Sequence, residues 1–106
     1  MRHLWARGFG KLYRDAELIT TDDGKTFLLA VIEFEQRTLG NGKSYSQRVQ
    51  FRSFDRDDME IVDQLVAGTY VMFDGDCDAT ADKSQTGWWY ANPRVTGRIH
   101  EISHAS

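Results

Sequence analysis

One stretch of the chain has apolar residues at helical spacing, and the segments on both sides of it have the patterns of β-strands. Four apolar residues recur at intervals of three, three and one: Met59, Val62, Leu65 and Val66. This spacing predicts a helix that ends at Gly68, with Asp55 or Asp57 as its N-cap. No other convincing helical pattern is present, so the chain is constrained to a mainly β fold.

Strand patterns occupy most of the remaining sequence. We expect five strands, at residues 2–14, 25–36, 45–54, 69–81 and 88–102. Thr21-Asp22-Asp23-Gly24 is a strong turn signal before the second strand. Gly75 marks a bend in the fourth strand, and Pro93 confines the first part of the last strand to an edge or a bulge.

The chain's size and composition are those of one globular domain. Its 106 residues, 41% hydrophobic and 27% charged, are enough for a single core, so we expect one domain over residues 1–106, with 102–106 as a short C-terminal tail. An apolar window of about 18 residues and a signal-peptide pattern are both missing, which favours an intracellular protein without membrane contact. Cys77 is the one cysteine and the three histidines are scattered, so we expect no disulfide, metal or cofactor.

Three large aromatic residues are adjacent at Trp88, Trp89 and Tyr90, behind the polar run 80–86. Neighbours on a strand point to opposite sides, so at least one of the three should face outward. An exposed flat ring at a junction of loop and strand suits stacking on an unpaired nucleobase. The alternative is that all three serve packing, in the core, under the preceding loop or in a subunit interface.

Five strands with one helix between the third and fourth are the order of the OB fold, a partly open Greek-key barrel. The expected fold class is therefore all-β with one short helix, built as a five-stranded OB barrel. In that barrel the apolar face of the helix should cover one end.

Several segments carry glycine, valine and charged residues in a recognisable order: Gly8-Phe9-Gly10-Lys11 with Asp15-Ala16-Glu17-Leu18, Asp23-Gly24-Lys25, Arg48-Val49-Gln50-Phe51, and residues 65–75. With these segments the chain resembles the bacterial single-stranded DNA-binding protein family over nearly its full length. The resemblance implies a non-catalytic OB barrel that binds single-stranded DNA with little sequence preference, in replication, recombination or repair. It also implies a homodimer or homotetramer in the cytoplasm or on the nucleoid, and it leaves RNA binding open.

Such proteins bind a strand over a basic surface and stack its bases on aromatic rings. In this chain, Arg48 and Arg52 are expected on the outward face of the third strand, with aromatic and basic residues from the neighbouring loops and the last strand. The candidate nucleic-acid-binding residues are Arg37, Lys43, Tyr45, Arg48, Arg52, Phe54, Lys83, Trp88, Trp89 and Arg94. The alternative for the arginines is a solvated outer face without a ligand.

Acidic residues depart from the family pattern. Asp74, Asp76 and Asp78 alternate on one outward face where the family usually has basic residues, and three carboxylates there would repel phosphate. Glu33 and Glu35 are also expected to point outward. These acids line either the binding surface or a subunit contact, and the sequence leaves both open.

The chain's end also departs from that pattern. The sequence stops at Ser106, without the glycine-rich acidic tail typical of the family. The resemblance therefore implies a core that lacks the recruiting arm: a shortened form, a phage- or plasmid-type variant, or a paralogue resembling the tail-less primosomal replication protein.

The sequence also bears on two other classes of function, a metal-dependent or other enzyme and a protein-interaction domain. Alternate strand positions hold Asp74, Asp76 and Asp78 about 6.5–7 Å apart, which is wide for one metal ion. Serine, histidine and acid residues have no triad order, and no phosphate-binding glycine motif is present, so we expect neither an enzyme nor a small-molecule substrate. The stronger rival is a protein-interaction OB domain, such as a replication accessory paralogue, that uses Trp88, Trp89 and Tyr90 as interface anchors.

Overall fold

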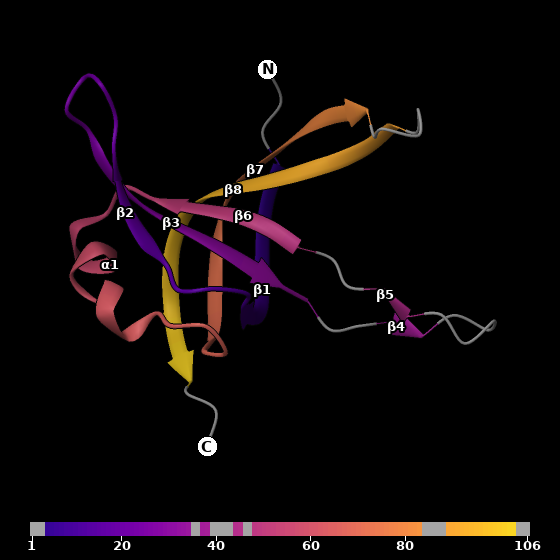
Figure 1. Ribbon diagram of the computed structural model, residues 1–106, viewed down its shortest axis with the longest axis horizontal. Coiled ribbons are helices and arrows are strands. Elements are labelled where there is room, and N and C mark those ends of the chain that lie inside the picture. The colour runs from indigo at the N-terminus through magenta and orange to yellow at the C-terminus, as the bar shows by residue number, and fades with distance from the viewer. Residues whose placement is uncertain (1–3, 35–36, 39–43, 46–47, 84–88, 104–106) are drawn as a thin grey trace.

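Five strands close into a barrel in the order β1-β7-β8-β6-β3 (Figure 1). The computed structural model describes residues 4–34, 37–38, 44–45, 48–83 and 89–103, with side-chain surroundings at 4–34, 48–78 and 93–103. The barrel strands are β1 (Leu4–Leu12), β3 (Thr26–Glu33), β6 (Arg48–Ser53), β7 (Tyr70–Lys83) and β8 (Trp89–Ser103). The end of β1 pairs with β3 as well as β7, which closes the barrel, and β6 runs parallel to β8. The OB fold expected from the sequence is confirmed.

Three further short strands extend this plan. β4 (Arg37–Thr38) and β5 (Ser44–Tyr45) pair with each other; β4 lies beyond the expected strand over 25–36, and β5 overlaps the start of the strand expected over 45–54. Figure 1 shows this pair standing away from the barrel. β2 (Glu17–Thr20) was not expected, because four residues carry too little alternation, and it forms a hairpin with β3. The predicted turn connects β2 and β3, with Gly24 at a φ of 86°.

Two glycines allow the long strands β7 and β8 to pass close to each other. Gly75 and Gly97 are register partners, and a Cβ on either would overlap the backbone of the opposite strand. The bend expected at Gly75 is therefore matched by a glycine on the partner strand, and Figure 1 shows β8 turning sharply along its length. This close backbone contact leaves no room for a side chain at either glycine position.

The core lies inside the barrel and is formed by alternate residues of its strands. Phe51 and Phe73 are fully or almost fully buried, and their ring centroids lie 5.4 Å apart. Val95 and Ile99 of β8 are buried as expected, and Ile102 packs against the core while partly buried. The other buried apolar residues are Leu12, Leu28, Ala30, Ile32, Val49, Leu65 and Val71.

The helical segment is shorter than its apolar spacing predicts. α1 (Arg56–Glu60) ends before the 3₁₀ turn η1 (Val62–Gln64), because the chain leaves helical geometry at Ile61. Within η1 the Leu65 N–H bonds the Val62 carbonyl, an interval of three residues, so the register of an α-helix is lost. The expected helix up to Gly68 is therefore wrong, and Val66 is 44% exposed rather than packed.

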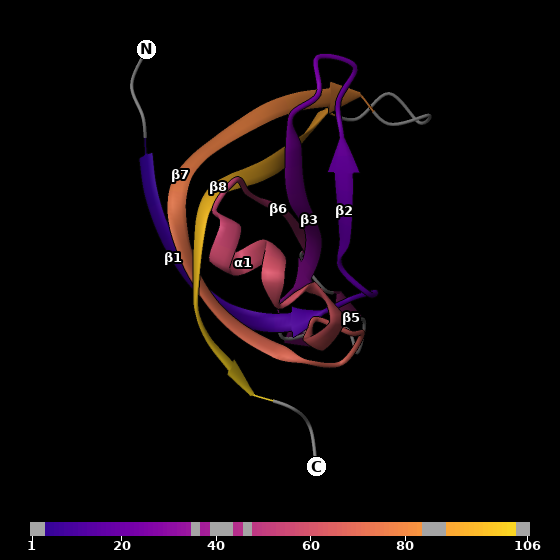
Figure 2. The ribbon, with the colours of Figure 1, turned by 90° about the vertical axis from the view of Figure 1, so that its left-hand side faces the viewer.

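Other expectations about this segment are confirmed. The Asp55 side chain caps α1 by accepting from the Asp57 N–H at 2.8 Å. Leu65 is fully buried, and Met59 and Val62 pack against the core. Figure 2 shows α1 framed by β1, β3 and β8, over one end of the barrel. In the described part of the chain, no helix has the length and apolar character needed to span a membrane.

Candidate nucleic-acid interface

Polar residues form the outward face of β6. Val49, Phe51 and Ser53 are buried, and the alternate residues Arg48, Gln50 and Arg52 are exposed or partly exposed. This division follows from the two-residue period of a strand, and it was expected from the sequence. The face therefore presents two guanidinium groups separated by one amide.

The sheet register adds a third arginine to this face. Arg94 of β8 lies opposite Gln50, and Thr96 lies opposite Arg52. Paired positions on neighbouring strands place their side chains on the same face of a sheet. We call Arg48, Gln50, Arg52 and Arg94 the arginine face.

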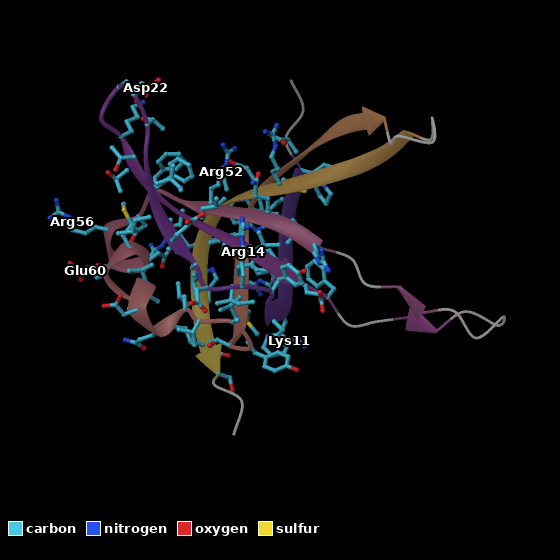
Figure 3. All side chains as sticks on the ribbon, in the orientation of Figure 1. Lys11, Arg14, Asp22, Arg52, Arg56 and Glu60 are labelled. Carbon is cyan, nitrogen blue, oxygen red and sulfur yellow. The ribbon has the colours of Figure 1, made fainter. Side chains whose placement is uncertain are left out.

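Arg52 is partly buried and donates a hydrogen bond to β8. Its Nη2 donates to Thr96 Oγ1 at 3.4 Å, and its Nε is buried without a hydrogen-bond partner among the described residues. A guanidinium has five N–H donors, so Arg52 keeps donors available for an anionic ligand. Figure 3 labels this side chain on the barrel.

Arg48 contacts one residue of β3 and one residue that follows β1. Its Nε lies 3.2 Å from Glu33 Oε2, and its guanidinium carbon lies 3.7 Å from the centroid of the Tyr13 ring. Tyr13 follows β1 and was not among the residues selected from the sequence. No local pattern could have identified it, because only the pairing of β1 with β3 brings it near β6.

Phe54 continues the arginine face past the end of β6. The ring is 51% exposed, and its centroid lies 5.3 Å from that of Phe27 on β3. Phe54 was selected from the sequence, whereas Phe27 was not. The pair leaves an aromatic surface beside Arg52.

The acidic residues of the fourth strand have different surroundings. Asp78 is paired with Arg94 at 3.2 Å, at the margin of the arginine face. Asp74 is buried between β1 and β8, 2.7 Å from His100 and 3.4 Å from Arg7. The hydrogen bond with His100, and to a smaller extent Arg7, lowers the pKa of Asp74 below its ordinary value of 3.8. Much of the repulsion expected from the sequence is therefore offset by cations within the protein.

The aspartates do not gather into a metal site. Asp76 is exposed, and the other two are bound to cationic partners on different strands. Within the described ranges, no group of three or more His, Cys, Asp or Glu side chains is arranged to hold a metal ion.

Several residues selected from the sequence have only their backbone described. Arg37 pairs in register with Tyr45 across β4 and β5, and Lys83 pairs with Trp89 across β7 and β8. Lys43 and Trp88 lie outside the described residues. The structure thus brings together Arg48, Arg52, Phe54 and Arg94 from the predicted set.

A second exposed apolar surface lies on β1 and β7. Trp5 and Phe9 of β1 are 67% and 55% exposed, and Phe9 stacks on Tyr70 of β7 with a centroid distance of 5.5 Å. Leu4 is 71% exposed. These residues were not among the candidates selected from the sequence, because an apolar residue on a barrel strand is equally consistent with the core.

Comparisons with known proteins identify the fold. No model of a known protein family matches the sequence, and no curated protein matches it either. Among solved structures, the chain is similar to a small single-stranded DNA-binding protein from Streptomyces coelicolor, with a TM-score of 0.67 and 10% identity over 99% of this chain and 96% of that one. It is also similar to a mitochondrial single-stranded DNA-binding protein from S. cerevisiae, with a TM-score of 0.65 and 12% identity over 98% and 96% of the two chains.

A third similar structure is the SSB of Plasmodium falciparum in complex with ssDNA. Its TM-score is 0.62, with 12% identity over 93% of this chain and 90% of that chain. These likenesses extend over almost the whole of both chains in each case. They confirm the OB barrel that the sequence resemblance implied.

Proposed function

We propose that this protein binds single-stranded DNA without catalysis and with little sequence preference, through the arginine face. The observation that carries the proposal is the meeting of Arg48, Arg52 and Arg94 on the outer surface of β6 and β8. In OB folds, the outer face of the second and third barrel strands is the usual site for oligonucleotides, and here those strands are β3 and β6. Guanidinium groups suit phosphate because they donate in a bidentate manner and remain charged.

Aromatic residues supply the second part of the proposed site. Phe54 lies at one end of the arginine face, and its ring is half exposed. A base stacked on such a ring contributes on the order of 1–3 kcal/mol, whatever the base. We assign the same role to Trp88 or Trp89, and an accessory role in phosphate binding or stacking to Arg37, Lys43, Tyr45 and Lys83.

Binding of this kind would serve replication, recombination or repair, in the cytoplasm or on the nucleoid. The structural likeness to single-stranded DNA-binding proteins supports this assignment. The net charge of −3 does not oppose it, because two carboxylates near the arginine face, Glu33 and Asp78, are already paired with arginines. Steering of the nucleic acid depends on the local field more than on the net charge.

The exposed apolar surface of β1 and β7 favours a homodimer or homotetramer. Trp5, Phe9 and Tyr70 belong to residue types that are enriched at protein interfaces. This surface also favours the second candidate function, a protein-interaction OB domain of a replication accessory protein. The two functions are compatible on one molecule because this surface and the arginine face involve different residues.

Titration of the intrinsic Trp fluorescence with oligo-dT, at low and high salt, tests the proposed function. We expect a saturable fluorescence change at low salt and an affinity that falls steeply as salt rises, because bound phosphates release counterions. Sedimentation of the same samples measures the oligomeric state. Absence of any binding at low salt would exclude the DNA-binding proposal, and a defined oligomer would then favour the protein-interaction domain.

A further inference from the structure

Tyr13 and Arg48 form a stacked pair on the protein surface. The guanidinium carbon of Arg48 lies 3.7 Å above the centre of the Tyr13 ring. Tyr13 is 49% exposed and the Arg48 side chain is 48% exposed. Two planar groups are thus in contact while about half of each remains accessible to a ligand.

The surrounding structure holds this pair in place. The Tyr13 N–H donates to the Val31 carbonyl at 2.9 Å, and the preceding residue, Leu12, is buried. On the other side, the Glu33 carboxylate accepts from Arg48 Nε at 3.2 Å. A ligand that stacks on the pair therefore does not have to order a free loop, which reduces the entropic cost of binding.

The chemistry of the pair matches a nucleotide. Aromatic rings and guanidinium planes both stack on nucleobases, and the tyrosine ring also stabilises the arginine charge through a cation–π contact. Lys11 and Arg14, labelled in Figure 3, flank Tyr13 along the chain and are exposed. Cations beside a stacking ring suit the phosphates on either side of a bound base.

We propose that Tyr13 and Arg48 form a nucleotide subsite, in which one base of the bound single strand stacks on this pair. The inference rests on the proposed function and extends the binding surface from β6 and β8 to the end of β1. It assigns a ligand-binding role to Tyr13, and it gives Arg48 a stacking role in addition to its charge.

The test compares Tyr13→Ala and Tyr13→Phe with the unaltered protein on two ligands: oligo-dT and an abasic deoxyribose-phosphate strand of equal length. We expect Tyr13→Ala to weaken oligo-dT binding by about 5- to 150-fold, the range that corresponds to one stacked base. The loss of affinity for the abasic strand should be much smaller, because that strand has no base to stack. Tyr13→Phe keeps the ring and should bind almost as the unaltered protein does.

Two controls separate stacking from other effects. Leu18→Ala removes a side chain of β2 that is 45% exposed and belongs neither to the arginine face nor to the exposed surface of β1 and β7, and it should leave the affinity for oligo-dT unchanged. Arg48→Lys keeps the charge but loses the planar group, so it should weaken binding while the salt dependence stays the same. Circular dichroism checks that each variant is folded. If Tyr13→Ala does not fold, Arg48→Lys tests the subsite through the same comparison, because loss of stacking weakens binding of oligo-dT more than binding of the abasic strand.

The outcomes separate this inference from the proposed function. If the unaltered protein does not bind oligo-dT at low salt, the proposed function itself is wrong. If it binds and folded Tyr13→Ala binds equally well, only the subsite is excluded. An equal loss on oligo-dT and on the abasic strand would also overturn the subsite, because it would show that Tyr13 acts on the protein's structure rather than on a base.

Discussion

The Ser53 hydroxyl donates a 2.6 Å hydrogen bond to the Asp58 carboxylate, and both side chains are buried. The same carboxylate oxygen accepts from the backbone N–H of Ile99 at 3.2 Å and from Arg98 Nε at 3.3 Å. Asp58 therefore connects α1 to β6 and β8. A buried charge is stable in such a position only when several donors satisfy it.

Replacing Asp58 should destabilise the barrel. Asp58→Ala removes the acceptor of two buried donors, and each orphaned group costs about 1–3 kcal/mol, so we expect a loss of about 2–5 kcal/mol in urea denaturation. Asp55→Ala is the matched control, because Asp55 caps α1 and also contacts Arg98, at 3.3 Å. It should cost about 1 kcal/mol. Equal losses in the two variants would mean that Asp58 does not connect the helix to the strands.

The 3₁₀ turn predicts that two neighbouring residues, Leu65 and Val66, contribute very differently to the stability of the fold. Leu65 is fully buried, so Leu65→Ala should cost about 2–5 kcal/mol through lost packing and a residual cavity. Val66 is 44% exposed, so Val66→Ala should change the stability by less than about 0.5 kcal/mol. Thermal or urea denaturation measures both. Folded Leu65→Ala should keep its affinity for oligo-dT, and a loss there would contradict the separation of this end of the barrel from the arginine face.

The crossing of β7 and β8 should not tolerate a side chain at Gly97. Gly97→Ala brings a Cβ into the carbonyl of Asp74, and the backbone there cannot move without breaking the ladder between the two strands. We expect a loss of about 3 kcal/mol or more in denaturant unfolding. Gly24→Ala is the control: its Cβ would meet open space, and it should cost about 1–2 kcal/mol through its positive φ alone. A Gly97→Ala variant as stable as the unaltered protein would contradict the close crossing.

The pairing of Asp74 with His100 and Arg7 predicts a pH dependence on the acid side. The pKa of Asp74 is lower in the folded protein than its ordinary value of 3.8, so the ionised form stabilises the fold. This contribution is complete above pH 3.8 and disappears as the pH falls through the lower, folded-state pKa. The free energies of unfolding of the unaltered protein and of Asp74→Asn should therefore differ most above about pH 4 and become equal in stronger acid. Urea denaturation at a series of pH values measures both. A stability difference that stayed constant down to pH 2 would contradict the pairing.

Salt dependence tests the phosphate-binding role of the arginine face. Arg48→Ala combined with Arg52→Ala should lower the affinity for oligo-dT and reduce the slope of log K against log salt by about 1.4, since each phosphate contact on a single strand contributes about 0.7. Arg56→Ala is the control, because Arg56 is exposed on α1 and points away from the barrel (Figure 3). An unchanged slope in the double variant would mean that these arginines form only a solvated outer face.

Patterns governed by local backbone geometry were predictable from the sequence. The two-residue period of a strand was enough to assign Val49 and Phe51 to the core and Arg48 and Arg52 to the surface. The turn before β3 followed from residues that favour positive φ, and Asp55, one of the two expected caps, is the N-cap of α1. The length of the helix was wrong, because contacts with the barrel rather than spacing decide where Leu65 and Val66 point.

The amino-acid sequence alone determined the mainly β architecture, the order of the barrel strands and the helix along the chain, and two of the arginines on the outer face. Strand alternation and turn preferences act over a few residues, and they can be recognised in any chain that contains them. Only the tertiary structure decided that Arg94, a candidate from the sequence, lies opposite Gln50, that Glu33 holds Arg48 and that Tyr13 stacks on it. These contacts depend on the register between strands far apart in the sequence, and that register is fixed by closure of the barrel as a whole.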